Sequence, residues 1–168
     1  QGKSAGSEEA EKKVSMHSYG AHFVEVTWQP EIARLAVSRV VTVIDAGTVI
    51  NTRTGRNQIE GAIIMGVGMA LFEETEYDQR SGAPLNSNLA DYIMTTHADA
   101  PQVDITFLDY PDTALNPLGA RGIGEIGLAG IAAAITDAVR HATGVQVRDL
   151  PVRIEDLLGA PAPFASRL

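Results

Sequence analysis

The first part of the chain alternates apolar and polar residues, a period-two pattern that indicates β-strands. The alternation runs through residues 18–28 and again through residues 34–45. Gln29, Pro30 and Glu31 lie between the two segments, and proline fits a short turn at this place. The pattern therefore predicts an antiparallel hairpin of two long strands.

Two later segments repeat apolar residues at the spacing of an α-helix. They predict a helix over residues 54–72 that is apolar on almost all sides. They also predict a second helix over residues 125–142, which is apolar in the same way until Asp137 and Arg140. A helix at the surface of a small domain keeps one polar side, so helices without such a side imply contacts on several sides. We therefore expect a large protein partner. The alternative is that the chain's own sheet wraps around both helices.

Shorter segments predict three more strands and a terminal helical turn, in chain order residues 88–94, 103–108, 145–148 and 154–158. Strands and helices mix without the regular alternation of a βαβ fold. This favours the α+β class, with a mixed, mostly antiparallel sheet and two long apolar helices packed against it. Small and charged residues predict a linker or tail over residues 1–17, and residues 18–168 are expected to form one domain.

Composition narrows the classes of function. The chain has 168 residues, a formal charge of −8 and no cysteine. The negative charge argues against nucleic-acid binding, and the apolar segments are too short to span a bilayer. Without thiolates, this chain holds neither an iron–sulfur cluster nor a zinc site with cysteine ligands. No signal peptide is evident, which favours a cytoplasmic location, or a periplasmic one if a partner directs export.

The segment Gly-Ala-Arg-Gly-Ile-Gly-Glu-Ile-Gly, residues 119–127, is the strongest candidate site. One carboxylate, Glu125, stands among four glycines at the start of the second predicted helix. Glycine lets the backbone turn tightly or approach another group closely. In the first turn of a helix, the positive end of the helix dipole favours an ionised carboxylate, which could act as a base. The alternative interpretation is an ordinary first-turn acidic residue.

Residues 122–127 also match the pattern G-x-G-x-x-G of dinucleotide-binding loops. That motif needs a buried strand running directly into the glycines. Here the apolar run at residues 103–108 ends early, and a segment with two prolines intervenes. A dinucleotide-binding domain is therefore kept only as a weak alternative.

Several motifs along the chain resemble one known family. Residues 119–127, the helix after them and the ending at residues 142–151 look like the C-terminal end of the molybdopterin-binding large subunit of the xanthine dehydrogenase and aldehyde oxidase family. Further similar motifs occur in the same order at residues 45–51, 58–74, 86–92 and 96–101. The resemblance covers residues 18–158 and rests on several collinear motifs rather than on one glycine pattern.

This resemblance implies the C-terminal fragment of a molybdopterin-binding domain in a molybdenum hydroxylase. Such an enzyme would oxidise an aldehyde or a nitrogen heterocycle with water as the oxygen source. Glu125 occupies the place of the family's catalytic base, and Gln58 that of a glutamine that helps to bind molybdopterin. Gly122 and Gly124 would allow close approach of the backbone to the cofactor. The metal takes sulfur ligands from the pterin, so this chain is expected to supply no metal ligand.

The resemblance also implies partners. The remainder of the molybdenum subunit is expected to complete the cofactor site, and iron–sulfur clusters and FAD are expected on partner chains or domains. The other ligand is a small-molecule substrate. A second function class remains open, namely a non-catalytic assembly module that keeps the fold without the cofactor.

Overall fold

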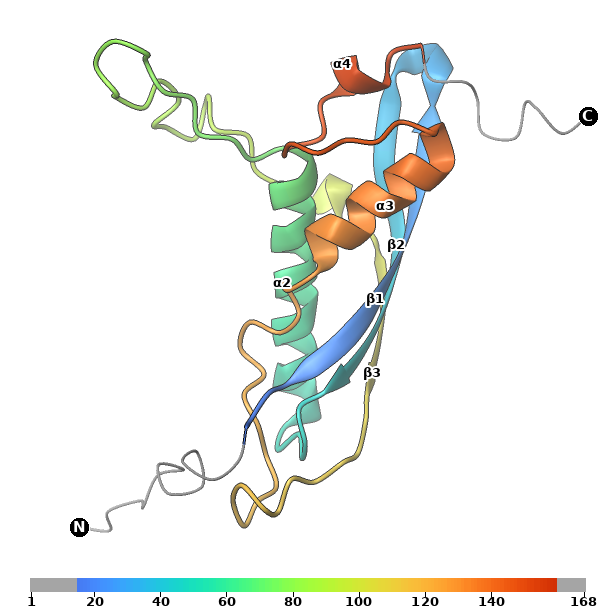
Figure 1. Ribbon diagram of the computed structural model, residues 1–168, viewed down its shortest axis with the longest axis vertical. Coiled ribbons are helices and arrows are strands. Elements are labelled where there is room, and N and C mark those ends of the chain that lie inside the picture. Colours follow the sequence, from blue (N-terminus) through green and yellow to red (C-terminus); the bar gives the residue numbers. More distant parts are fainter. Residues whose placement is uncertain (1–14, 160–168) are drawn as a thin grey trace, which may run out of the picture.

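The computed structural model describes residues 15–159, which build a three-stranded sheet with helices packed against it (Figure 1). The sheet order is β1 (Tyr19–Gln29), β2 (Arg34–Asp45) and β3 (Gln102–Phe107). Strands β1 and β2 are antiparallel, which confirms the predicted hairpin, and a short 3₁₀ helix, η1 (Pro30–Ile32), forms its turn. Strands β2 and β3 are parallel.

One β-bulge directs the apolar residues of the hairpin toward the core. The register shifts between Glu25 and Val26, which leaves Ser38 of β2 without a partner in β1 within the hairpin. The Ser38 hydroxyl donates a hydrogen bond to the Glu25 carboxylate at 2.6 Å. Because one extra residue shifts the alternation of faces, Val37 and Val40 are both buried in the same apolar cluster.

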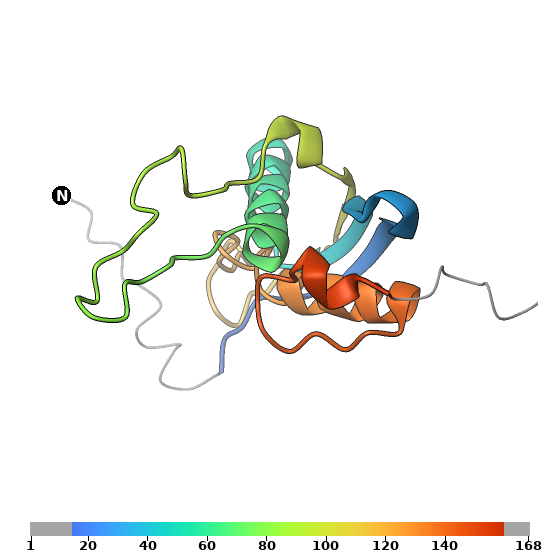
Figure 2. The same cartoon turned by 90° about the horizontal axis from the view of Figure 1, so that it is seen from above.

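Helices α2 (Thr52–Leu71) and α3 (Ile131–Thr143) lie side by side and cover the sheet (Figures 1 and 2). Helix α2 is the helix predicted over residues 54–72. It begins where it does because the Asn51 side chain accepts hydrogen bonds from the N–H groups of Arg53 and Thr54, each at 3.1 Å. Helix α2 therefore starts two residues earlier than the apolar pattern suggested.

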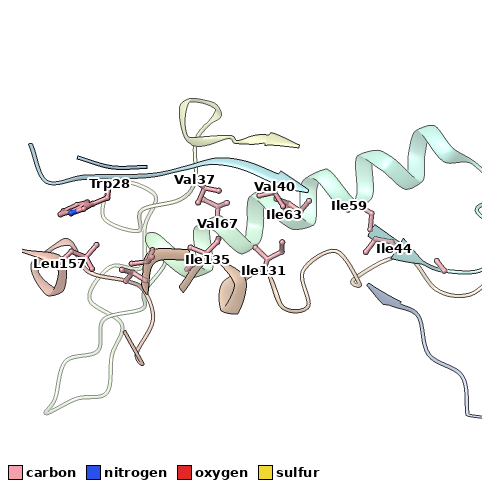
Figure 3. Close-up of a cluster of buried hydrophobic side chains, with 14 residues drawn as sticks. Trp28, Val37, Val40, Ile44, Ile59, Ile63, Val67, Ile131, Ile135 and Leu157 are labelled. Carbon is pink, nitrogen blue, oxygen red and sulfur yellow. The ribbon is translucent and has the colours of Figure 1, made fainter. Parts of the chain in front are cut away.

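The core fills the space between the sheet and the two helices (Figure 3). Residues of α2, α3 and β2 that are completely buried meet there, among them Ile63, Ile131, Ile135, Val40 and Ile44. Gly66 of α2 permits this contact, because a Cβ at that position would stand 2.4 Å from the Ile131 side chain. The core thus fixes the N-terminal end of α3 against the middle of α2.

The helix predicted over residues 125–142 is wrong at its start. Helix α3 begins at Ile131, after Gly130 with φ +87°, and residues 125–130 form turns. Glu125 therefore lies outside the helix, and the argument from the helix dipole does not apply to it. The description as two long apolar helices is also not confirmed, because α3 has 13 residues with an exposed Arg140 and α2 exposes Met65.

Two predicted strands do not form. Residues 88–94 and 145–148 are turns or irregular backbone. Asn88 explains the first, since its side-chain oxygen accepts from the N–H groups of Ala90 and Asp91 and closes a turn. With one antiparallel and one parallel pair, the sheet is mixed rather than mostly antiparallel.

The remaining elements are short. Residues 73–96 project from the end of α2 as a long excursion (Figure 1). A 3₁₀ helix, η2 (His97–Asp99), leads from it into β3, and α4 (Ile154–Leu157) matches the predicted helical turn. Within residues 15–159, no helix combines the length and the apolar character needed to cross a membrane. The predicted tail at residues 1–17 lies mostly outside the described residues.

Candidate functional site

A pocket of about 440 Å³ lies at the N-terminal end of α2, where the segment that follows β2 and residues 120–124 meet it. The polar side chains in its lining are Thr48, Asn51, Thr54, Gln58 and Arg121. Hydroxyl and amide groups both donate and accept hydrogen bonds, so this lining suits a polar heterocycle. Pockets that bind small molecules usually have volumes of about 300–1,000 Å³. The pocket is therefore large enough to hold part of a cofactor.

Gln58 joins the pocket to the glycine-rich segment. Helix α2 places Thr54 and Gln58 on one side, four residues apart, facing residues 120–124. The Gln58 Nε2 atom donates a hydrogen bond to the Gly124 carbonyl at 2.8 Å. An amide that donates to the backbone in this way keeps its Oε1 atom to accept a hydrogen bond from a ligand.

The two predicted cofactor-binding glycines lie in irregular backbone. Gly124 lines the pocket, whereas Gly122 does not, and the Gly122 carbonyl accepts a hydrogen bond from the Ser18 hydroxyl at 2.5 Å. A Cβ atom at either glycine would meet nothing within 4 Å. Space beside this backbone is thus open to a ligand or to another part of the protein.

Glu125 directly follows Gly124 but does not line the pocket. It is exposed, in the turn that precedes α3, and its carbonyl accepts a hydrogen bond from the Leu128 N–H at 3.0 Å. The structure therefore brings Gln58 and Gly124 into contact, with Glu125 as the next residue along the chain. The geometry of a dinucleotide loop is missing, because β3 ends at Phe107 and no strand in the described residues leads into residues 122–127.

Sequence reasoning missed Arg121 as a site residue. Its guanidinium is paired with the Asp45 carboxylate and, at 3.0 Å, with Asp112, and only 9% of its side chain is exposed. Although burial opposes ionisation, hydrogen bonds from the Gly47 N–H and the Tyr19 hydroxyl hold the pKa of Asp45 below its ordinary value, and the guanidinium adds to this effect. A signal was available in the sequence, since Arg121 is the sole cation in the glycine-rich segment and Asp45 ends an apolar strand.

His22 is a second residue that the sequence did not single out. It lies on β1 beside the turn at residues 126–130, and its Nδ1 atom is 2.6 Å from the Thr42 hydroxyl. Burial lowers the pKa of His22, against the opposing effect of the Ala129 and Ile126 backbone. Its ring is therefore neutral near pH 7 and supports the turn without adding charge.

Comparison with known proteins identifies the family. Residues 3–101 match the profile of the molybdopterin cofactor-binding domain. The chain belongs to this family. The matched range includes Gln58, while residues 119–127 lie beyond it. The resemblance inferred from the sequence motifs is thereby confirmed.

Relatives of this chain include molybdenum-binding subunits of oxidoreductases. The chain is 41% identical over 147 residues, 88% of its length, to the aldehyde oxidoreductase molybdenum-binding subunit PaoC of Escherichia coli (strain K12). It is 36% identical over 135 residues, 80% of its length, to the putative xanthine dehydrogenase molybdenum-binding subunit XdhA of the same strain. It spans only 20% and 18% of these two relatives.

A solved structure has the same arrangement of elements. The aldehyde oxidoreductase from Desulfovibrio desulfuricans ATCC 27774 superposes with a TM-score of 0.76 at 31% identity, over 87% of this chain and 16% of that one. The fold described above is thus a small part of a much larger protein in its relatives.

The residues present fit the family's cofactor in their chemistry. Gln58, Asn51 and Thr54 offer neutral donors and acceptors along one side of the pocket, and neutral groups bind a heterocycle edge without adding charge. The open space beside Gly122 and Gly124 permits close approach to the backbone. No group of three or more His, Cys, Asp and Glu side chains within residues 15–159 could hold a metal ion. The described residues therefore offer neutral contacts of the kind that an organic cofactor needs.

Proposed function

We propose that residues 18–168 are the C-terminal catalytic portion of a molybdenum hydroxylase, which oxidises aldehydes or N-heterocycles with water as the oxygen donor. One observation carries the proposal. The 2.8 Å hydrogen bond from Gln58 to the Gly124 carbonyl joins the expected cofactor contact to the residue before Glu125. Residues 66 positions apart in the chain are thereby held at one end of α2.

The proposed roles follow from the groups that the site offers. When bound, the molybdenum cofactor supplies the two-electron oxidation. Glu125 acts as the general base, and a carboxylate oxygen accepts the proton of the hydroxyl group that attacks the electron-poor carbon. Gln58 binds the pterin through its Oε1 atom while its Nε2 atom holds Gly124. Gly122 and Gly124 keep the backbone open beside the cofactor.

The substrate class is proposed from the chemistry and from the relatives. An aldehyde carbon and a carbon next to a ring nitrogen are both electron-poor, so one hydroxylation chemistry serves both. The relatives include one named as an aldehyde oxidoreductase subunit and one named as a xanthine dehydrogenase subunit. The net reaction adds one oxygen from water to the substrate carbon and releases two protons and two electrons.

The proposed partners are the remainder of the molybdenum subunit, an iron–sulfur subunit or domain, and an FAD subunit or domain. Several large apolar side chains are exposed on α2 and on the excursion at residues 73–96, namely Met65, Met69, Leu85, Leu89 and Ile93. Exposed apolar residues of this kind favour a surface that another protein covers. Because the chain has no cysteine, iron–sulfur clusters that accept the electrons must be held elsewhere.

Anaerobic turnover tests the proposed reaction. We expect the assembled enzyme to hydroxylate an N-heterocycle without oxygen gas, with a dye as electron acceptor, and to incorporate ¹⁸O from labelled water into the product. An N-heterocycle is used as the substrate because an aldehyde exchanges its own oxygen with water, which would label the product without any enzymatic reaction. Enzyme produced without molybdate serves as the control and is expected to be inactive. A hydroxylated product that carries no ¹⁸O from the labelled water would refute the proposed reaction.

A further inference from the structure

The buried ion cluster around Arg121 connects three separate segments of the chain. Arg121 belongs to the glycine-rich segment, Asp45 ends β2, and Asp112 lies in the loop that follows β3. The Arg121 side chain is 9% exposed and that of Asp45 is 3% exposed. The Tyr19 ring of β1 lies 5.9 Å from the guanidinium carbon, close enough for a cation–π contact.

We propose that Arg121 is a positioning residue, which holds residues 119–125 against the end of β2 and so sets the place of Glu125. This inference rests on the proposed function of Glu125 as the base. Arg121 itself does not act on the substrate. It acts through the backbone that leads, four residues later, to the carboxylate.

Backbone hydrogen bonds show how the segment is attached on the Arg121 side. The Arg121 N–H donates to the Ala46 carbonyl at 2.8 Å, and the Thr48 N–H donates to the Gly119 carbonyl at 2.8 Å. Gly47 and Ala120 form an isolated antiparallel bridge between these bonds. Residues 119–121 therefore add a short, strand-like pairing to the chain that leaves β2.

The same segment is attached again near Glu125. The Ser18 hydroxyl donates to the Gly122 carbonyl at 2.5 Å, and Gln58 donates to the Gly124 carbonyl at 2.8 Å. Neither glycine has a side chain that packs against the fold. Between these attachments the backbone has no regular secondary structure, so its position depends on them.

The charges of the cluster make Arg121 the critical member. A guanidinium donates to two carboxylates at once through separate N–H groups, which an ammonium cannot reproduce with the same geometry. Removing the cation leaves two nearby carboxylates, one of them buried, with no opposite charge. An uncompensated buried charge is strongly destabilising. We expect the glycine-rich segment to move away from Asp45 when the cation is lost.

The test replaces Arg121 in the assembled enzyme. Arg121→Met is expected to lower kcat by about 10–100-fold, the effect of displacing a catalytic group by roughly 1 Å. Because Arg121 also lines the pocket, kcat is counted per bound pterin, and KM is expected to stay within about twofold, since displacement of the base affects the chemical step rather than substrate binding. Amide hydrogen exchange of residues 119–125 is expected to become faster, and Arg121→Lys is expected to restore part of both kcat and protection.

Arg140→Met is the matched control, because it removes an exposed arginine from the Arg140–Asp137 pair on α3. It is expected to change neither kcat nor exchange. Equal behaviour of the two methionine variants would overturn the positioning role, and so would loss of pterin in proportion to kcat. If Arg121→Met fails to assemble, Asp112→Asn decides the question. This variant keeps the ion pair between Arg121 and Asp45, and it is still expected to lower kcat and to speed amide exchange of residues 119–125. If it does neither, the positioning role of Arg121 is overturned.

The outcomes separate this inference from the proposed function. An inactive Glu125→Gln enzyme together with an unaffected Arg121→Met enzyme would refute only the positioning role. A fully active Glu125→Gln enzyme would refute the function of Glu125 and with it the role of Arg121 in turnover. Faster exchange in Arg121→Met would then remain as a purely structural effect.

Discussion

Replacing Glu125 with glutamine is expected to lower kcat by roughly 10²–10⁴-fold, the usual contribution of a general base. Glutamine has nearly the same shape but its amide does not accept the proton. Because Glu125 is exposed and follows irregular backbone, the substitution is expected to leave the fold unchanged. Molybdenum and pterin contents should therefore equal those of the unmodified enzyme, as measured by metal analysis and by pterin fluorescence after release.

Glu31→Gln is the matched control for this experiment. Glu31 is an exposed glutamate in η1, at the turn of the hairpin. The same chemical change there is expected to leave kcat unaltered. Retained turnover in Glu125→Gln, with a normal cofactor content, would remove the base assignment and favour the assembly module.

The second large effect, on stability, is expected from replacing Gly47 with alanine, because both the backbone conformation and a neighbouring carbonyl oxygen disfavour a Cβ atom there. Gly47 has φ +65°, and a Cβ at this position would lie 2.2 Å from the Gly119 carbonyl oxygen. The left-handed backbone costs about 1–2 kcal/mol for alanine, and overpacking adds about 1–3 kcal/mol. Gly47→Ala should therefore lower the free energy of opening of residues 46–48 and 119–121 by about 2–5 kcal/mol. Amide hydrogen exchange of the assembled enzyme measures this change.

Gly82→Ala provides the control, because it separates the backbone cost from the clash. Gly82 has φ +69°, yet a Cβ there would meet nothing within 4 Å. Gly82→Ala should lower the free energy of opening only by the backbone contribution of about 1–2 kcal/mol, and only within the excursion at residues 73–96. We also expect Gly47→Ala, unlike Gly82→Ala, to lower turnover. Similar exchange and turnover in the two variants would contradict the account of the 46–48 and 119–121 pairing.

Strong local periodicity allowed the hairpin and α2 to be predicted. Alternation of apolar and polar residues over more than ten positions indicates a β-strand, and a long run of apolar residues at helical spacing before a charged turn indicates a helix. The β-bulge at Ser38 could not be predicted, because a single extra residue changes the pairing without changing the composition of the strand.

The start of α3 was predicted wrongly because apolar residues continue at helical spacing on both sides of Gly130. A positive φ at that glycine breaks the helix, and spacing does not reveal it. The apolar pattern also predicts a strand over residues 88–94, whereas Asn88 favours a turn there through its own side chain. In both places a single residue with a special backbone preference overrode the apolar pattern.

The candidate site was predictable only in part. Motifs predict Gln58 and Glu125 as site residues, and the structure adds the hydrogen bond that links Gln58 to Gly124. The ion pair between Arg121 and Asp45 joins residues 76 positions apart, and spacing along the chain carries no signal for such a contact. Long-range pairs of this kind require the fold to be known first.

A structure of the assembled enzyme with its cofactor would test the central claim most directly. The account predicts that the Glu125 carboxylate lies within hydrogen-bond reach of the molybdenum cofactor, with Gln58 in contact with the pterin. It also predicts that another part of the molybdenum subunit covers the exposed side of this site. A Glu125 carboxylate that faces bulk solvent, remote from the pterin, would contradict the account.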